Sequence, residues 1–547
     1  MHSTGFPLLL AIIATPAIGA LVVALLPARR PEIAKALGYA FTLATAGLCG
    51  YLLWHYQAGD AGFQFVEDRP WIPGLGVRFT VGVDGISLFM VAVTALLFPL
   101  GLLGSEKYIA HRVKHYVAWF LMLEMAIMGI FLTLDLVAFF IFWEFMLVPM
   151  YFLILGWGSA RRKYAATKFF LYTGAGSALL LASTLVLGFL HQADTGVLSF
   201  DFRVLAEWNG LSGTAEVLLF LGFMAAFAIK APLFPFHTWL PDVHTEAPTA
   251  GSVVLAGIII KMGAYGFVRF SFELFPQASV DLAPLLLVLA VIGILYGAIV
   301  AAMQTDLKRV IAYSSVAHMG FVVLGIFSLT AIGIDGAVFT MVSHPLTTGA
   351  LFLLVGMIYE RLHTREIGEM GGLWKPAPIL TGLFVAAMFA GIGLPGFSGF
   401  VGEFLSLVGA FVYDRPFAIV ATFGVILAAL YMLWAFQKAF TGRARGAVAK
   451  IRDVDLREIV VVVPLVALSL FLGIYPKPVL DRIEPASDRA VLNFERKTDY
   501  RSPEDADERR ERIREVERAE RRDADADDGE DAGSGSGGVH VHGKGGR

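Results

Sequence analysis

Cysteine is almost absent from this chain of 547 residues, in which Cys49 is the only one. A single thiol excludes an internal disulfide, an iron–sulfur cluster held by several thiolates and a zinc site built from cysteines. The sequence also has no glycine-rich nucleotide loop after a strand and no P-loop signature. We therefore expect no redox centre and no cofactor in this chain, and a partner subunit or an opposing ion gradient must supply its energy.

Charged residues are scarce as well. They make up 16% of the chain, whereas hydrophobic residues make up 57%. This balance predicts a polytopic membrane protein in contact with lipid, and no basic patch indicates a nucleic acid partner.

Apolar segments long enough to cross about 30 Å of hydrocarbon recur along the chain. The fold class that they predict is an all-α polytopic membrane protein with about fourteen transmembrane helices. The segments run roughly over residues 5–26, 34–56, 84–103, 115–133, 135–156, 168–190, 216–238, 249–273, 281–303, 307–329, 333–360, 378–411, 417–440 and 457–475.

Lys and Arg residues between the segments lie mostly in loops after odd-numbered segments, as Arg29, Arg112 and Arg443 do. By the positive-inside rule these loops are cytoplasmic, so we expect both termini on the outer face. The first segment has no Lys or Arg before it and is followed by Arg29 and Arg30, the reverse of a cleavable signal peptide. We expect it to remain as a helix.

Two segments contain helix-breaking residues. The seventh includes KAPLFPFHTWLP and the twelfth includes GIGLPGFSGFVGEF, so both helices should break. Breaks five helices apart are typical of inverted repeats with a site near the midplane of the membrane. We predict a membrane domain over 1–480, in which helices 4–8 (about 115–273) and helices 9–13 (about 281–440) form inverted five-helix repeats. Residues 481–547 should be a charged tail, partly helical from Ser502 and disordered from Asp523.

Six ionisable side chains each lie within a stretch of 20 or more mostly apolar residues. An isolated charge at the centre of a membrane costs about 2.5–3.5 kcal/mol on insertion scales, so such groups should face protein or water. Acids, bases and imidazoles together indicate a path for protons. The six residues are Glu144, Lys230, Lys261, His318, His344 and Glu403.

The two lysines are candidate proton carriers. Lys261 lies near the middle of the eighth segment, about 18 Å from either end at 1.5 Å per residue, too far for its side chain to reach the interface. Glu144 lies mid-helix in the fifth segment, and our hypothesis is that it pairs with Lys230 and modulates its proton affinity. Glu124, in the fourth segment, is a second carboxyl of the same kind.

The histidines have two interpretations. His318 and His344 could be core histidines bonded to backbone, yet an ordinary pKa of about 6.5 suits them to carry protons between Lys261 and Glu403. A metal site at His318, His344 and Glu403 would need convergence that the spacing does not require. Four further polar residues at the cytoplasmic end of the seventh segment could line the inner mouth of a path or cap helix ends: His237, Asp242, His244 and Glu246.

Four motifs resemble the antiporter-like membrane subunits of respiratory complex I. They are FWEFMLVPMYFLILGWG, KAPLFPFHTWLPDVHTEAPTAGSVVLAGIIIKMGAYG, DLKRVIAYSSVAHMG and GLPGFSGFVGEF, and the resemblance covers roughly residues 80–475. Glu403, where L- and N-type relatives carry a lysine, and the absence of a long lateral helix indicate the M-type branch. Pro345 and Thr348 make the surroundings of His344 less typical of the family.

The resemblance implies a proton-translocating subunit of NADH:quinone oxidoreductase in the inner (cytoplasmic) membrane. It implies that Glu144 and Lys230 form the first half-channel, that Lys261 and His318 form the central connection, and that Glu403 is the exit group. NADH, FMN, iron–sulfur clusters and quinone are expected in partner subunits, and L-type and N-type subunits are the expected neighbours. A subunit of a multisubunit Na⁺/H⁺ antiporter and a structural membrane scaffold are the alternatives.

Overall fold

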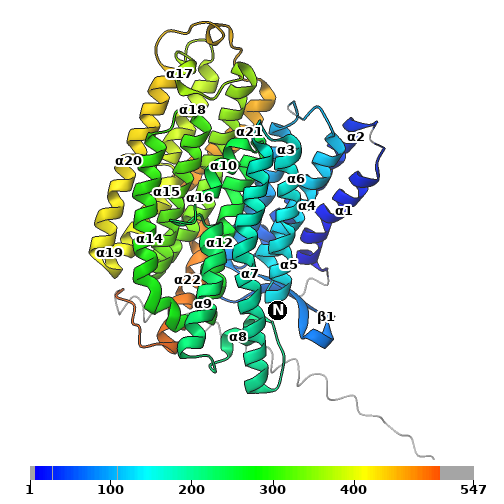
Figure 1. Cartoon of the computed structure of the whole chain (residues 1–547), viewed down its shortest axis with the longest axis vertical. Coiled ribbons are helices and arrows are strands. Elements are labelled where there is room, and N and C mark those ends of the chain that lie inside the picture. Colours follow the sequence, from blue (N-terminus) through cyan, green and yellow to red (C-terminus); the bar gives the residue numbers. More distant parts are fainter. Residues whose placement is uncertain (1–5, 28, 108, 505–547) are drawn as a thin grey trace, which may run out of the picture.

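The computed structural model describes residues 6–27, 29–107 and 109–504, which form an upright bundle of helices with a short hairpin at one end (Figure 1). Thirteen helical spans in these ranges are long and apolar enough to cross a bilayer. The predicted all-helical membrane fold is confirmed.

The first half of the bundle runs to the end of the eighth predicted segment. Two of its turns, η2 (Leu255–Ile259) and η3 (Phe267–Ser271), are π-helical and lie within one continuous span from Thr249 to Leu274. The helices are α1 (Leu8–Leu25), α2 (Pro31–His55), α3 (Gly85–Gly104), α4 (Val113–Leu132), α5 (Leu136–Phe145), α6 (Leu147–Trp157), α7 (Arg162–Thr195), α8 (Phe202–Glu207), α9 (Gly213–Lys230), α10 (Trp239–Glu246), α11 (Thr249–Val254), α12 (Ile260–Gly266) and α13 (Phe272–Leu274).

The second half holds the remaining helices. They are α14 (Pro276–Ala302), α15 (Leu307–Phe327), α16 (Ala331–Leu362), α17 (Ile367–Met370), α18 (Pro378–Gly391), α19 (Ser398–Tyr413), α20 (Arg415–Phe440), α21 (Leu456–Ile474) and α22 (Lys477–Lys497). A short 3₁₀ turn, η4 (Val448–Lys450), precedes α21, and another, η1 (Pro73–Leu75), lies in the first half.

Both predicted breaks are present. The seventh segment stops at Lys230, the last residue of α9, and resumes as α10 after a stretch that contains Pro232 and Pro235. The twelfth segment forms two shorter helices, α18 and α19, so this pair and the thirteen long spans account for the fourteen predicted segments. Gly393 and Gly396 between them adopt φ of +71° and +101°, which only glycine adopts readily.

The fifth segment has an interruption that we did not predict. Helix α5 ends at Phe145 and α6 begins at Leu147. Pro149 explains it, because a proline ring clashes with the carbonyl four residues earlier, here that of Phe145. Glu144 therefore lies at a proline break, as Lys230 does.

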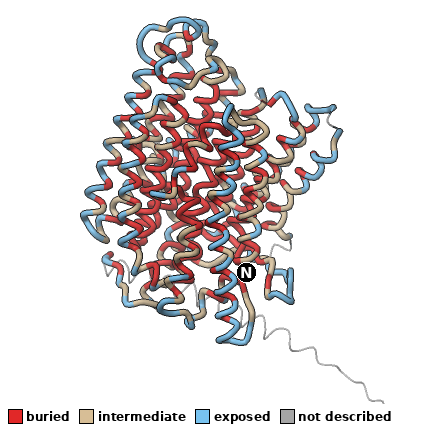
Figure 2. Tube along the Cα trace, in the orientation of Figure 1, coloured by how far each residue is buried: buried red, intermediate tan, exposed pale blue. Residues whose placement is uncertain are grey.

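Burial is greatest in the middle of the bundle (Figure 2). Every residue is buried in the most apolar stretches of Thr249–Leu274 and Ala331–Leu362, and 94% of them in Leu307–Phe327. In the outer spans α20 and α21 the share is only 33%. The three most enclosed spans carry Lys261, His318 and His344, and they are the spans best protected from lipid.

An antiparallel hairpin was not anticipated in an all-helical chain. Strand β1 (Gln64–Ile72) pairs with β2 (Val77–Val83) between α2 and α3. Helix α22 follows the last span and contacts α3, α13, α14 and α16. We call the end of the bundle that carries the hairpin and α22 the hairpin end.

Helix α22 also bears on the domain boundary. The predicted division between residues 480 and 481 falls inside this helix, which packs on the bundle. Ser502 to Glu504 are described and are not helical, and the rest of the predicted tail lies outside the described residues. The inverted repeats over 115–273 and 281–440 stay a prediction.

Buried charges join α22 to the rest of the hairpin end. Asp84, which caps α3, lies 2.5 Å from Arg269 and 3.2 Å from Arg489 of α22. Arg489 also lies 3.6 Å from Glu273. These two acids and two bases, which we call the hairpin-end charge cluster, come from three distant parts of the chain.

Candidate functional site

Lys261 and His344 are hydrogen-bonded in the middle of the bundle. The ammonium nitrogen of Lys261 lies 2.7 Å from Nδ1 of His344, and it also donates to the carbonyl of Ala256. On its other side, Nε2 of His344 lies 3.2 Å from the Thr348 hydroxyl. Lys261 is fully buried and His344 is 4% exposed.

His318 and Glu403 form the second pair. Nδ1 of His318 lies 2.6 Å from Oε1 of Glu403, and both side chains are buried. A Cβ on Gly393, in the break of the twelfth segment, would lie 3.0 Å from Oε2 of Glu403. The break therefore places the backbone of Gly393, which has no side chain, next to the carboxylate of Glu403.

The two pairs adjoin. The ring centroids of His318 and His344 are 5.3 Å apart, with an angle of 71° between the ring planes. Four of the six predicted residues thus form a continuous series, Lys261, His344, His318 and Glu403, which we call the central series. Its members come from four different elements: α12, α16, α15 and α19.

The π-helical turn η2 places Lys261. It widens the helix just before α12, so that the Ala256 carbonyl, five residues earlier, accepts from the lysine ammonium. Single π turns inside α-helices are frequent at functional sites. No residue pattern in the sequence predicts this turn.

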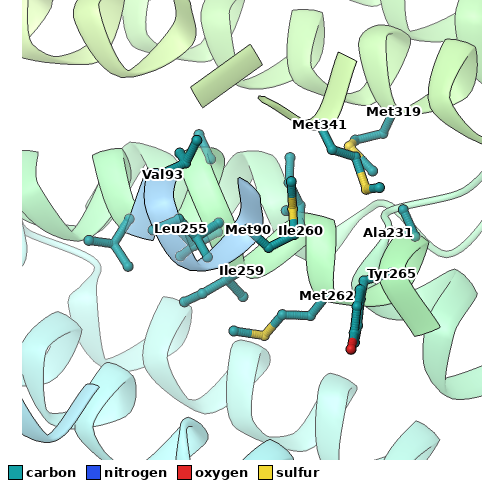
Figure 3. Close-up of a cluster of buried hydrophobic side chains, with 14 of the residues drawn as sticks. Met90, Val93, Ala231, Leu255, Ile259, Ile260, Met262, Tyr265, Met319 and Met341 are labelled. Atoms are coloured by element: carbon teal, nitrogen blue, oxygen red, sulfur yellow. The ribbon is translucent and has the colours of Figure 1, made fainter. Parts of the chain in front are cut away.

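The spans that carry Lys261, His318 and His344 also supply a cluster of buried apolar side chains (Figure 3). Figure 3 shows Leu255, Ile259, Ile260 and Met262 from the span that carries Lys261, with Met319 and Met341 projecting from neighbouring helices. Met319 follows His318 directly, and all six are buried. A low-polarity shell strengthens the electrostatic interactions inside it and excludes bulk water.

Lys230 and Glu144 are arranged differently. The ammonium of Lys230 is buried, has no hydrogen-bond partner among the described residues, and lies over the rings of Trp143 (4.8 Å) and Phe169 (5.7 Å). Oε1 of Glu144 also lacks a partner there. The two side chains interact electrostatically, but the structure places no direct ion pair between them.

The secondary candidates have separate environments. Glu124 is fully buried, and both of its carboxylate oxygens lack a partner among the described residues. His237 packs against Phe234 and Tyr296, whereas Asp242 pairs with Lys168 at 2.7 Å.

His244 and Glu246 differ again. His244 is fully buried and interacts electrostatically with both Lys308 and Lys261, so it lies beside the central series. Glu246 accepts a hydrogen bond from the backbone nitrogen of Arg161, just before α7, at 2.8 Å. This contact fits the predicted role of capping a helix end.

Sequence analysis missed the hydroxyl groups near the series. Ser343, next to His344, lies 2.8 Å from Ser398, which lies 2.8 Å from Ser469. All three are buried. Serine and threonine are tolerated in any helix, so only the position of Ser398 inside the predicted break could have drawn attention to it.

A metal site was the other interpretation of His318, His344 and Glu403. In the parts of the chain that the structure describes, no group of three or more His, Cys, Asp or Glu side chains could hold a metal ion. His344 instead contacts Lys261 and Thr348, and His318 contacts Glu403.

Comparison with known proteins identifies the family. Residues 133–429 match the family described as NADH:quinone oxidoreductase/Mrp antiporter, TM. The NADH-quinone oxidoreductase subunit M of Rhodobacter capsulatus is 45% identical over 84% of this chain and 91% of its own length. The chain belongs to the subunit M family of NADH-quinone oxidoreductases. The M-type resemblance is therefore confirmed.

Solved structures agree with this family. A chain of respiratory complex I from Thermus thermophilus with bound NADH is 33% identical and matches with a TM-score of 0.81 over 89% of this chain and 99% of its own. A chain of the Mrp complex from Dietzia sp. is 23% identical and matches with a TM-score of 0.77 over 89% of this chain and 100% of its own. The second likeness shows the shared fold alone.

Proposed function

We propose that this subunit M family member translocates protons in the membrane arm of respiratory complex I. The observation that carries the proposal is the central series, in which Lys261, His344, His318 and Glu403 are buried side by side in the most enclosed part of the bundle. Ionisable residues inside a membrane mark proton and ion pathways by default.

The first pair can exchange a proton directly. A charged lysine ammonium can only donate hydrogen bonds, so Nδ1 of His344 must accept from Lys261. Nε2 of His344 then carries the imidazole hydrogen and faces Thr348. Transfer from Lys261 to Nδ1 produces an imidazolium and a neutral amine. The second proton, on Nε2, is then the one that can leave on the far side of the ring.

The second pair completes the series. Nδ1 of His318 donates to the Glu403 carboxylate at 2.6 Å, a length typical of a charge-assisted bond. No direct hydrogen bond joins the two imidazoles among the described residues, so one water or a rotation of a ring must carry the proton between them. Glu403 is then the acceptor at the end of the series.

Lys230 and Glu144 are proposed to recharge the series. Both lie at proline breaks, and both have atoms free of hydrogen-bond partners in the described parts of the chain. A nearby carboxylate stabilises the charged lysine, so movement or protonation of Glu144 would release the proton of Lys230 toward Lys261. His244, between Lys308 and Lys261, provides an intake from the loop end opposite the hairpin.

The rest of the machine lies in other subunits. NADH oxidation and quinone reduction, with FMN and iron–sulfur clusters, are assigned to partner chains, and L-type and N-type subunits are the proposed neighbours. Both termini are proposed to lie on the outer face of the inner membrane, so the hairpin end faces outward. Charge changes passed on by a neighbour would then shift Glu144 first.

The test uses Lys261→Met in the assembled complex. Methionine fills similar volume but cannot carry a proton, so we expect intact assembly and fewer protons pumped per NADH oxidised. Lys438→Met, at an exposed position of α20, is the matched control and should pump normally. Proton uptake and NADH oxidation are measured together in inverted membrane vesicles.

Two outcomes would decide against the proposal. Normal pumping by Lys261→Met would support a structural scaffold. Na⁺-dependent proton exchange in the absence of NADH would instead favour a Na⁺/H⁺ antiporter subunit.

A further inference from the structure

Asp335 is a buried carboxyl that neither the sequence motifs nor the central series uses. It lies in the second turn of α16, 7% exposed, and its Oδ1 has no hydrogen-bond partner among the described residues. A buried carboxylate oxygen without a partner costs free energy, so its retention requires an explanation.

The surroundings of Asp335 are acidic. Ser487, Glu484 and Asp488 of α22 approach it, and Glu504 lies near it beyond the end of α22. The three charged groups among these residues are all acidic. The described residues hold no cluster with metal-binding geometry, so the observations favour a proton as the ligand of this carboxyl.

Ser406 links the same region to Glu403. It lies one turn after Glu403 on α19, on the same face of the helix, and in the direction of the hairpin end. The serine is fully buried, and its hydroxyl has no partner among the described residues.

Close packing fixes the position of Ser406 against α16. A Cβ on Gly336, the residue after Asp335, would lie 2.3 Å from the Ser406 backbone nitrogen. A Cβ on Gly325 would lie 2.7 Å from the Ser406 hydroxyl. The hydroxyl thus sits among glycine backbones between Glu403 and the level of Asp335.

We propose that Ser406 and Asp335 form the proton-release route from Glu403 to the hairpin end. Protonated Glu403 gives its proton to water beside Ser406, whose hydroxyl accepts one hydrogen bond and donates another. Asp335 takes the proton as a carboxylate and releases it to water beside Glu484 and Asp488. Each transfer breaks one O–H bond and forms another, so no further reactant is needed.

This inference rests on the proposed function, and its experiment separates the two. Asp335→Asn, Asp335→Glu and Ser406→Ala are made in the assembled complex, with Asp281→Asn as control, because Asp281 is an exposed carboxyl at the same end of the bundle. Protons pumped per NADH oxidised are measured in inverted vesicles, and native gels report assembly.

We expect the ratio of protons to NADH to fall in Asp335→Asn and in Ser406→Ala. It should stay near the normal value in Asp335→Glu and in Asp281→Asn. If the ratio is normal in Ser406→Ala and in Asp335→Asn while Lys261→Met lowers it, the release route is wrong and the proposed function stands. If Asp335→Asn does not assemble, Ser406→Ala decides, and a normal ratio in that variant overturns the route.

Discussion

Lys230 and Glu144 differ from the central series because the Lys230 ammonium and Oε1 of Glu144 have no hydrogen-bond partner among the described residues. The ammonium of Lys230 lies over two aromatic rings, and a cation in such a position is stabilised by about 0.5–2 kcal/mol. That is small beside the several kcal/mol that desolvation of a buried ion costs. The electrostatic contribution of Glu144 therefore matters to the proton affinity of Lys230.

Glu144→Gln tests this contribution. The amide removes the negative charge at similar size, so Lys230 should hold its proton less firmly, and we expect slower pumping with NADH oxidation less affected. Proton uptake in vesicles checks this result. Glu32→Gln, at an exposed position of α2, serves as control, and pumping equal to the control would show that Glu144 does not act on Lys230.

The site was predictable from the sequence to the extent that its residues are costly in a membrane. Lys261, His318, His344 and Glu403 stand out because hydrocarbon excludes charge. Ser343 and Ser398 do not, because a hydroxyl in a helix can satisfy itself on the preceding turn. Contact distances between helices also cannot be obtained from one sequence, so the sequence cannot tell a direct ion pair of Glu144 with Lys230 from a longer electrostatic interaction.

At the level of elements, one crossing sets the distance between the two lysine-bearing helices. A Cβ on Gly263, two residues after Lys261, would lie 2.3 Å from the Phe227 carbonyl oxygen and 2.5 Å from the Ala231 nitrogen. These atoms belong to the last turn of α9 and the residue after Lys230. The glycine allows the two backbones to touch.

Gly263→Ala should separate these helices. Its methyl group meets backbone that cannot move aside, and overpacking of this kind costs about 1–3 kcal/mol. We expect a lower melting temperature of the purified complex and weaker pumping. Gly174→Ala, in α7 with open space around its Cβ position, should be neutral or slightly stabilising. Equal behaviour of the two variants would contradict the crossing.

Two elements at the hairpin end escaped sequence analysis for a physical reason. Helix α22 is amphipathic and rich in charge, so its composition resembles that of a solvated tail, although Ile483, Val491 and Phe494 are buried against the bundle. The hairpin is a short stretch between strong hydrophobic runs. By contrast, the breaks at Pro232 and Gly393 were predictable because proline and glycine act locally.

At the scale of the whole molecule, Lys261, His318 and His344 lie in the spans that are most enclosed by other helices. The outer spans are half or less buried, and the central ones are almost wholly so. Long apolar runs predicted this bundle well, since span length and hydropathy are local properties. Which spans lie at the centre depends on tertiary packing, and the sequence did not show it.

The scarcity of cysteine allows the orientation in the membrane to be tested by labelling introduced thiols. Cys49 is the only cysteine and is buried, so background labelling by a membrane-impermeant thiol reagent should be low. Leu75→Cys, at the exposed tip of the hairpin, should react in right-side-out vesicles, whereas Arg445→Cys, at the opposite end, should react only in inverted ones. The reverse pattern would place the termini on the cytoplasmic face.

The hairpin-end charge cluster also has a consequence for biosynthesis. Because translation runs from the N-terminus, Asp84 is made first, Arg269 second and Arg489 last of the three. Until α22 has been made and has packed against the bundle, Glu273 lacks its ion pair with Arg489, and the hairpin end stays uncovered on that side. A chain whose synthesis stops before α22 would therefore lack the ion pairs of Arg489, and quality-control proteases could recognise it by this uncovered end.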